Sequence, residues 1–396
     1  MADRLAIDGG PPVRAEMLPY GRHSLEEEDV QAVTAALRSG WLTTGPKVEE
    51  FERAIAAAAG ASHAVAVNSG TAALHAAVAA AGIGPGDEVI TSPLTFVASA
   101  NAVHYLGGRP VFADVRADTL CLDPVDAEMK LTPRTRALLP VDFAGQPADL
   151  DELGRIAAAR GLTVIEDAAH SLGGAYRGRA VGSIADLTTF SFHPVKIVTT
   201  GEGGAVTTER ADLAARMRRF RSHGIDGDFR DRDARGLPFS PMVELGFNYR
   251  LSDLGCALGV SQLGRLERCL KRRTQIAERY AAALADVREV TLPAVPAHVR
   301  HGWHIFPVLL DLDRLRVDRR AVLAALHAEN VGAIVHYVPA YWHPYYEALG
   351  YRRGLCPRAE AAWARLVTLP IFPAMSDGDL DDVVAALAKV LGAYAR

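Results

Sequence analysis

Lys196 is the residue of this chain whose surroundings best suit covalent chemistry. It ends the run SFHPVK at 191–196, which follows an apolar stretch and precedes the glycine-rich segment TTGEGG at 199–204. A lysine is usually a solvated surface charge. Where burial removes water from the amine, its pKa falls and the amine becomes a nucleophile. The position of Lys196 therefore makes it a candidate for covalent binding of a carbonyl group.

A second segment offers groups for binding a phosphate. Ser69, Gly70 and Thr71 follow the apolar run AVAV and open an alanine-rich helical stretch. The free N–H groups and the positive dipole at a helix start suit a phosphate monoester. An ordinary helix cap has the same residues, so this segment by itself favours neither interpretation. The hydroxyl of Ser191 would be available to the same phosphate.

Asp167 is the candidate partner for a cationic ring nitrogen. It follows the apolar run TVIE at 163–166. At the carboxyl end of a parallel strand, an aspartate projects into the crevice where open α/β sheets bind ligands. A carboxylate buried there needs a cation beside it, and a protonated pyridine would supply one. Capping of the next helix explains Asp167 equally well when the motif is taken alone.

The elements that must position these residues form an α/β pattern. Short apolar runs alternate with helical stretches, which predicts a mostly parallel sheet covered by helices. Ser24 to Glu27 read as a capping box for a first helix that stops at Gly40. The charged stretch 226–241 reads as a loop. The predicted strands are 64–67, 88–91, 110–113, 137–141, 163–166 and 188–192.

A second, smaller region follows a long helical segment at 251–284. Its predicted strands are 305–312 and 333–338, and its predicted helices are 317–329 and 377–392. We place a domain boundary inside the long helical segment, because 396 residues exceed the size at which one core usually keeps growing. The resulting division is an N-terminal segment with a large cofactor-binding domain at 1–262, and a small α+β domain at 263–396.

Composition and missing motifs exclude several classes of protein. A net charge of −4 gives no basic surplus for nucleic acid. The chain has no G-x-G-x-x-G after a strand and no complete P-loop, which disfavours nicotinamide and ATP-driven enzymes. The four cysteines have neither disulfide-framework nor zinc spacing, and no metal site is expected. Without a signal peptide or a long apolar window, we expect a cytoplasmic protein with no membrane partner.

The motifs together resemble one family. NSGTAAL, TSPLTFVASANAV, DFAGQP, VIEDAAHSLG, SFHPVKIVTTGEGG, RSHGI and ELGFNYRLSD are similar to segments of the DegT-type sugar aminotransferases. This resemblance implies a pyridoxal 5'-phosphate (PLP) enzyme of fold type I, with pyridoxamine phosphate as the intermediate form of the cofactor. Within the family, SFHPVK, FRSHGI and the HYVP…PYY…LGY stretch most resemble members that aminate a UDP-linked N-acetylamino sugar in pseudaminic acid biosynthesis.

The resemblance also assigns roles to residues. It implies that Lys196 forms the Schiff base and that Asp167 pairs with the pyridinium nitrogen. Phe96 would lie over the cofactor ring and His170 beside it, although a phenylalanine at this position could also be core. The positions implied for the phosphate are Gly70, Thr71 and Ser191, together with Asn248 of the partner subunit in a homodimer with shared active sites.

The reaction implied moves an amino group from an amino acid, by resemblance L-glutamate, to the 4-keto carbon of a nucleotide-linked 4-keto-6-deoxy sugar. Thr43, His336 and Tyr337 match substrate-side segments of the family. Ile197 departs from the family, in which many members have Asn or Pro, so the sugar stays open, with a GDP- or dTDP-linked keto sugar as the alternative to a UDP-linked N-acetylamino sugar. Two further classes of protein stay open, a non-catalytic PLP-binding regulator and an amino-acid decarboxylase of the same fold. PLP-dependent sugar dehydratases carry histidine in place of Lys196.

Overall fold

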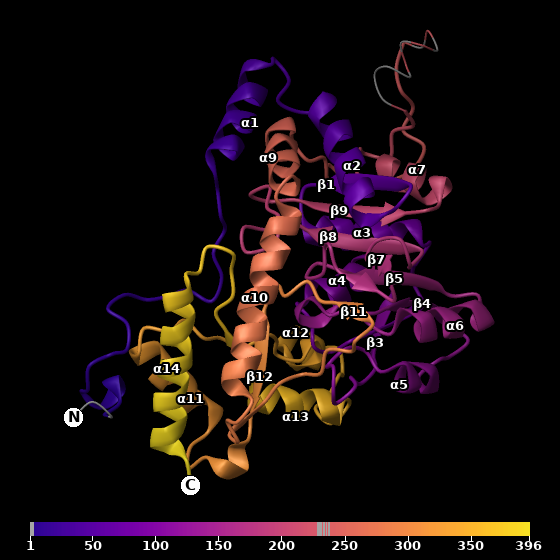
Figure 1. Ribbon diagram of the computed structural model, residues 1–396. Helices are drawn as coiled ribbons and strands as arrows, with labels where there is room; N and C mark the ends of the chain where they lie inside the picture. The colour runs from indigo at the N-terminus through magenta and orange to yellow at the C-terminus, as the bar shows by residue number, and fades with distance from the viewer. Residues whose placement is uncertain (1–3, 228–231, 233, 235, 237) are drawn as a thin grey trace.

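A seven-stranded sheet forms the centre of the computed structural model, which describes residues 4–227, 232, 234, 236 and 238–396 (Figure 1). The strand order is β1-β9-β8-β5-β4-β2-β3, and β9 alone runs antiparallel to its neighbours. The mostly parallel sheet predicted from the sequence is thus confirmed. The strands are β1 (His63–Val67), β2 (Glu88–Thr91), β3 (Arg109–Phe112), β4 (Thr135–Leu139), β5 (Thr163–Asp167), β8 (Leu187–Ser191) and β9 (Gly204–Thr208).

Helices cover both faces of this sheet, which explains why its strands are apolar throughout. Along β1, Val65 and Val67 pack with one set of helices, while Ala64 and Ala66 pack with another. The first set is α3 (Gly70–Ala80), α4 (Ala98–Tyr105) and α7 (Ala211–Phe220), and the second includes α2 (Pro46–Ala59), α9 (Asp253–Leu263) and α10 (Leu266–Leu284). On the side of β2 and β4, α5 (Pro124–Met129) and α6 (Leu150–Arg160) complete the layer.

The C-terminal part of the chain contributes to two cores. A three-stranded antiparallel sheet of β10 (Val290–Thr291), β12 (Phe306–Leu310) and β13 (Leu366–Leu369) packs with α10, α11 (Arg319–Ala328) and α14 (Asp377–Tyr394). Leu5 and Leu18 join this core from the N-terminus. Between β12 and β13 the chain returns to the large sheet through α12 (Pro344–Ala348) and α13 (Pro357–Arg365). The domain division at residue 262 stays a prediction.

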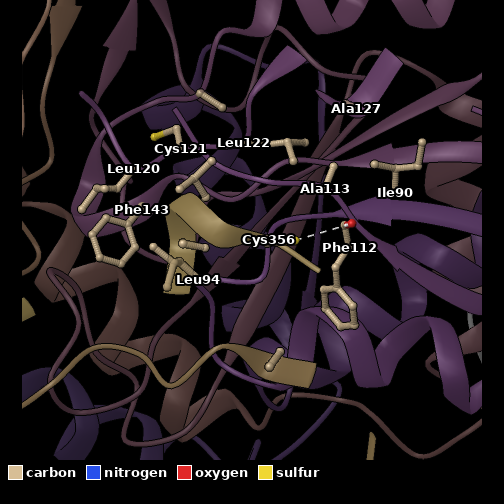
Figure 2. Packing of buried hydrophobic residues seen from close by; sticks show 14 of the residues in the cluster. Ile90, Leu94, Phe112, Ala113, Leu120, Cys121, Leu122, Ala127, Phe143 and Cys356 are labelled. Atoms are coloured by element: carbon tan, nitrogen blue, oxygen red, sulfur yellow. Dashed lines mark hydrogen bonds between the residues drawn. The ribbon is translucent and has the colours of Figure 1, made fainter. Parts of the chain in front are cut away.

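Figure 2 shows this return to the large core at close range. Cys356 lies among the side chains of Ile90, Leu94 and Phe112, and its thiol donates to the Phe112 carbonyl oxygen over 3.7 Å. Cys121, also buried in this cluster, donates to the Gln146 carbonyl oxygen. Both cysteines are buried, with free thiols.

The structure corrects three local predictions, and a fourth falls partly on residues that it does not describe. The first helix, α1 (Glu27–Arg38), is capped at Glu26, whose N–H donates to Asp29, so Ser24 is not its cap. The long helix is interrupted at residues 264–265, between α9 and α10. Residues 333–338 form no strand, only an isolated bridge from Ile334 to Thr368. Much of the loop predicted at 226–241 lies outside the described residues.

A short three-stranded sheet lies apart from the two larger ones. It consists of β6 (Ala175–Tyr176), β7 (Arg179–Ala180) and β11 (Val299–Arg300), in the order β11-β6-β7. Through the pairing of β11 with β6, the segment that leads into β12 is tied to the connection between β5 and β8 of the large sheet. Within the part of the chain that the structure describes, no helix is long and apolar enough to cross a membrane.

Candidate active site

A cavity of about 430 Å³ lies at the carboxyl ends of β5 and β8, beside the start of α3. This is the edge of the sheet where open α/β proteins bind ligands, and the volume lies within the usual range for a ligand pocket. Nine predicted site residues line the cavity: Gly70, Thr71, Phe96, Asp167, His170, Ser191, Lys196, His336 and Tyr337. The structure therefore brings together residues that are up to 267 positions apart (Gly70 to Tyr337) in the chain.

The phosphate-binding segment is formed by close packing of β8 against the first turn of α3. Ser69 caps α3, because its Oγ accepts from the Ala72 N–H over 3.0 Å. A Cβ added to Gly70 would lie 2.7 Å from the Cβ of Ser191, so only glycine fits there. The first-turn N–H groups and the hydroxyls of Thr71 and Ser191 thus face one small space. This arrangement suits a phosphate group.

Strand β9, which the sequence analysis did not predict, makes that packing possible. It lies between β1 and β8, and Gly204 pairs with both Val67 and Ser191. A Cβ added to Gly204 would lie 2.3 Å from the Ser69 carbonyl oxygen. Gly204 of the TTGEGG run therefore allows the close approach of backbones behind the phosphate-binding segment.

Asp167 is buried at the end of β5, with 5% of its surface exposed. Its Oδ2 accepts from Ser99 Oγ over 2.6 Å, and its Oδ1 accepts from the Ala169 N–H over 3.2 Å. Burial raises the pKa of Asp167, while these hydrogen bonds and the charge of Lys196 oppose the rise. A cation placed beside this carboxylate would keep it ionised. The capping interpretation of Asp167 is wrong, because a turn and not a helix follows β5, and the side chain lines the cavity.

The amine of Lys196 lies in the same cavity, and the surface-charge interpretation of this residue is wrong. Burial lowers its pKa to about 8, with the charge of Asp167 acting in the opposite direction. A substantial fraction of the amine is therefore neutral near physiological pH, as a nucleophile requires. Its Nζ lies 3.4 Å from Nε2 of His304.

Aromatic and imidazole rings form the rest of the wall. Phe96 is 59% exposed and faces the cavity, so it is not a core residue of this chain. Its ring centroid lies 6.3 Å from that of Tyr337, whose hydroxyl lies 3.1 Å from Nε2 of His170. The rings of His170 and His304 are 4.3 Å apart. Burial lowers the pKa of both imidazoles well below the ordinary value, so both are neutral.

Two predicted residues lie outside the cavity. Asn248 is exposed, and its main-chain oxygen accepts from the side chain of Asn68 over 3.4 Å. Thr43 is exposed and forms a backbone bridge with Ser252 at the start of α9. A role for Asn248 in the partner subunit's site and a substrate role for Thr43 stay predictions.

The sequence analysis missed several lining residues that have signals of their own. Ser99 lies on the first turn of α4, three positions after Phe96, and its N–H donates to the Phe96 carbonyl oxygen. His304 belongs to none of the motifs named in the sequence, and its approach to Lys196 depends on the fold of the C-terminal part. Tyr20 also lines the cavity, with its ring tilted against that of His336 and the ring centroids 5.2 Å apart. The described residues contain no cluster of three metal-ligating side chains.

These features fit a flat ring compound that carries a phosphate, a basic nitrogen and an aldehyde. The glycine-lined helix start would hold the phosphate, Asp167 the nitrogen, and the Lys196 amine the aldehyde. Two buried ring nitrogens, Nδ1 of His170 and Nδ1 of His304, have no hydrogen-bond partner among the described residues. Unpartnered polar atoms in a cavity wall are typical of a site that receives polar ligand atoms.

The fold and this site define a pyridoxal-phosphate-dependent aminotransferase of fold type I. Residues 23–388 match the DegT/DnrJ/EryC1/StrS aminotransferase family. The chain belongs to this family and is a sugar aminotransferase. Family membership therefore sets aside the regulator and the decarboxylase, and the cofactor predicted from the sequence is confirmed.

Relatives from three bacteria resemble this chain over nearly its whole length. Spore coat polysaccharide biosynthesis protein SpsC of Bacillus subtilis is 44% identical over 381 residues, which cover 96% of this chain and 98% of the relative. A putative sugar aminotransferase of Streptococcus pneumoniae, Spr1654, was solved in its pyridoxamine phosphate (PMP) form and matches with a TM-score of 0.90, 30% identity and coverage of 95% and 99%. It was also solved in PLP and apo forms. PseC of Helicobacter pylori, an aminotransferase of pseudaminic acid biosynthesis, matches with a TM-score of 0.89, 29% identity and coverage of 96% and 100%.

Proposed function

We propose that this enzyme transfers the amino group of an amino acid, L-glutamate, to the 4-keto carbon of a nucleotide-linked 4-keto-6-deoxy sugar, and that the sugar is a UDP-linked N-acetylamino sugar. The observation that carries the proposal is the cavity itself, in which Lys196, Asp167 and the phosphate-binding segment surround one space of about 430 Å³. The similarity to the H. pylori enzyme supports the choice of sugar.

The roles of the residues follow from their positions. When bound, PLP supplies an electron sink for the pair left behind as the Cα proton leaves. Asp167 keeps a positive charge on the ring nitrogen, since its buried carboxylate is stabilised by that charge. Lys196 binds the cofactor aldehyde through its amine. Lys196 would also be the group that carries the proton between the donor's Cα and the cofactor, because its amine is free once the donor has displaced it.

Other residues hold and enclose the cofactor. Gly70, Thr71 and Ser191 would hold the phosphate, and Phe96 and His170, which line the same cavity, would enclose the ring. His336 and Tyr337 lie in the same cavity wall, where a sugar bound next to the cofactor would contact them. Thr43, exposed outside the cavity, is the weaker substrate candidate.

The enzyme would act as a homodimer, in which the partner's Asn248 completes the phosphate site. Support for this comes from the exposure of Asn248 and of its neighbours Leu245 and Phe247 in a single chain. Phe247 and Tyr249 stack on each other, 5.0 Å apart, and pack against His75. In an extended segment, residues on either side of Asn248 point the other way, so Asn248 faces outward.

Half-reaction spectroscopy tests the proposed reaction. The enzyme is converted to its pyridoxamine form with L-glutamate, freed of donor, and mixed with UDP-, GDP- and dTDP-linked 4-keto sugars in turn. We expect the UDP-linked N-acetylamino sugar to restore the absorbance of the lysine-bound cofactor fastest. Faster reaction of a GDP- or dTDP-linked sugar would replace the proposed substrate. Failure of every sugar, with an enzyme that glutamate does convert, would refute amination of a 4-keto sugar nucleotide.

A further inference from the structure

The amine of Lys196 contacts one residue to which the proposed reaction gives no role. Its Nζ lies 3.4 Å from Nε2 of His304, which is 4% exposed. A neutral imidazole has one nitrogen that accepts a hydrogen bond and one that donates. With Nε2 accepting from the amine, Nδ1 carries the hydrogen. That Nδ1 is buried and has no hydrogen-bond partner among the described residues. An unpartnered buried N–H is energetically unfavourable and is rare in folded proteins outside functional sites.

Backbone hydrogen bonds on both sides hold His304 in place. Its N–H donates to the Ala144 carbonyl oxygen over 3.0 Å, and the N–H of Gly302 donates to Gly145 over 2.7 Å. Its own carbonyl oxygen accepts from Nη1 of Arg273 over 3.2 Å. The segment that carries His304 is thus fixed to the large domain on one side and to helix α10 on the other.

Arg273 is an unusual residue for the interior of a protein. It lies on α10, is 1% exposed, and forms no ion pair with a carboxylate within the described part of the chain. Its Nη1 instead donates to three carbonyl oxygens, those of Trp303, His304 and Ile371, over 3.0, 3.2 and 3.0 Å. A buried cation without an anion is costly, so its hydrogen bonds must provide a compensating gain.

We propose that His304 is a positioning residue, which holds the Lys196 amine through a hydrogen bond to Nε2, and that Arg273 fixes the His304 backbone for this purpose. The proposal rests on the role given above to Lys196. By this arrangement a helix of the C-terminal part sets the direction of the lysine amine in the large domain.

The other titratable groups around the amine decide what loss of His304 would do. Asp167 faces the amine from β5, and its charge raises the pKa of Lys196. His170, from the segment after β5, and His336, from the C-terminal part, have a lowered pKa because of burial. These rings are neutral and accept no proton from the lysine. Loss of the acceptor on His304 would therefore remove a bond that favours the ammonium form, and the pKa of Lys196 would fall.

The test is an NMR titration of Lys196 in the full chain. The chain contains five lysines, so ¹³Cε-lysine labelling gives a simple spectrum, and the Lys196 signal is the one that Lys196→Arg removes. Measurements are made on the cofactor-free and the pyridoxamine phosphate forms, in both of which the amine is free. We expect His304→Phe, which keeps a ring but has no hydrogen-bond acceptor, to lower the titration midpoint of the Lys196 amine by about one pKa unit. His304→Gln, which keeps an acceptor oxygen, should retain the midpoint of the unaltered enzyme.

Each outcome decides the proposal. An unchanged midpoint in His304→Phe would overturn it, and so would an equal fall in His304→Gln, because packing alone would then explain the effect. For Arg273, we expect Arg273→Met to lower the midpoint in the same direction as His304→Phe. Arg273→Lys, which keeps a cation, is the second variant if the first does not fold, and Arg279→Lys on the exposed side of α10 is the control. An unchanged midpoint in the folded Arg273 variant would remove Arg273 from the proposal.

The titration needs no sugar, so its failure is distinct from failure of the proposed function. If the Lys196 midpoint falls in His304→Phe but no sugar of the panel reacts, the positioning role of His304 stands and the proposed substrate is refuted. If the enzyme aminates the sugar but the Lys196 midpoint is unchanged in His304→Phe, the proposed function stands and the positioning role of His304 is refuted.

Discussion

Two buried carboxyl groups behind the active site predict how the stability of this enzyme depends on pH. Asp142 and Glu166 are both fully buried, and neither pairs with a cation in the described part of the chain. Asp142 accepts from Ser171 Oγ and Glu166 accepts from Thr188 Oγ1, while the Oε1 atom of Glu166 has no donor in the described part of the chain other than a proton carried by Asp142. Burial raises the pKa of Glu166 to about 7, and burial together with the charge of Glu166 raises the pKa of Asp142.

A carboxyl group with a raised pKa keeps its proton in the folded state after the unfolded state has lost it. The folded protein binds more protons, so stability falls as pH rises from about 4.5 through about 7. A shift of this size in Glu166 corresponds to about 3 kcal/mol. Glu166→Gln places an amide NH₂ where the unpartnered oxygen lies and needs no proton there. We therefore expect this variant to gain about 3 kcal/mol over the unaltered enzyme between pH 4.5 and pH 8.

Guanidinium unfolding at a series of pH values gives the free energy of unfolding of the variant and of the unaltered enzyme. Because the other titrating groups are the same in both proteins, their contributions cancel in the difference. Glu88→Gln is the matched control, because Glu88 is also buried but pairs with Arg134, and its pKa is lowered. The control should differ from the unaltered enzyme by a constant amount over the same pH range. A constant difference for Glu166→Gln as well would refute the idea that the folded state holds an extra proton at this pair.

Three further predictions concern the cofactor site. Asp167→Asn should lower the turnover number by about 10²-fold or more, because the ring nitrogen loses its charged partner, and steady-state kinetics would show it. Ser99→Ala removes the 2.6 Å hydrogen bond to Asp167, so the acid limb of the pH profile of kcat/KM should move up by about one unit; an unmoved limb would contradict this. Gly70→Ala places a methyl group 2.7 Å from the Cβ of Ser191 and should weaken PLP binding about tenfold or more, measured by cofactor titration, with Gly84→Ala as the control in open space.

The sequence predicted those parts of the site that lie at the ends of periodic apolar runs. Asp167 and Ser191 each end a strand, and Gly70 opens a helix, so strand and helix patterns were enough to place them near one sheet edge. β9 was missed because it lies within a glycine-rich run, GAVTT, whose role as a central strand depends on pairing with two neighbours. Local propensity carries no information about such pairing.

The residues contributed by the C-terminal part were harder to predict for the same reason. His304 reaches Lys196 only because Arg273 and Ala144 hold its backbone from two sides, and these contacts span more than 30 and 150 residues of sequence. The predicted strand at 333–338 shows the limit of periodicity. Its residues, AIVHYV, are mostly apolar, β-branched or aromatic, but the chain places His336 and Tyr337 in the cavity wall there and makes one bridge to Thr368 instead of a ladder.

The neutral imidazoles explain how one cavity can use a lysine as both nucleophile and proton carrier. A cationic histidine beside Lys196 would repel the ammonium form and would also compete with the ring nitrogen for the carboxylate of Asp167. Burial prevents this, because it lowers the pKa of His170, His304 and His336. The carboxylate of Asp167 then has no cationic imidazole beside it that would compete with a bound cationic ring. The amine keeps a pKa of about 8, at which it can both give and accept a proton near neutral pH.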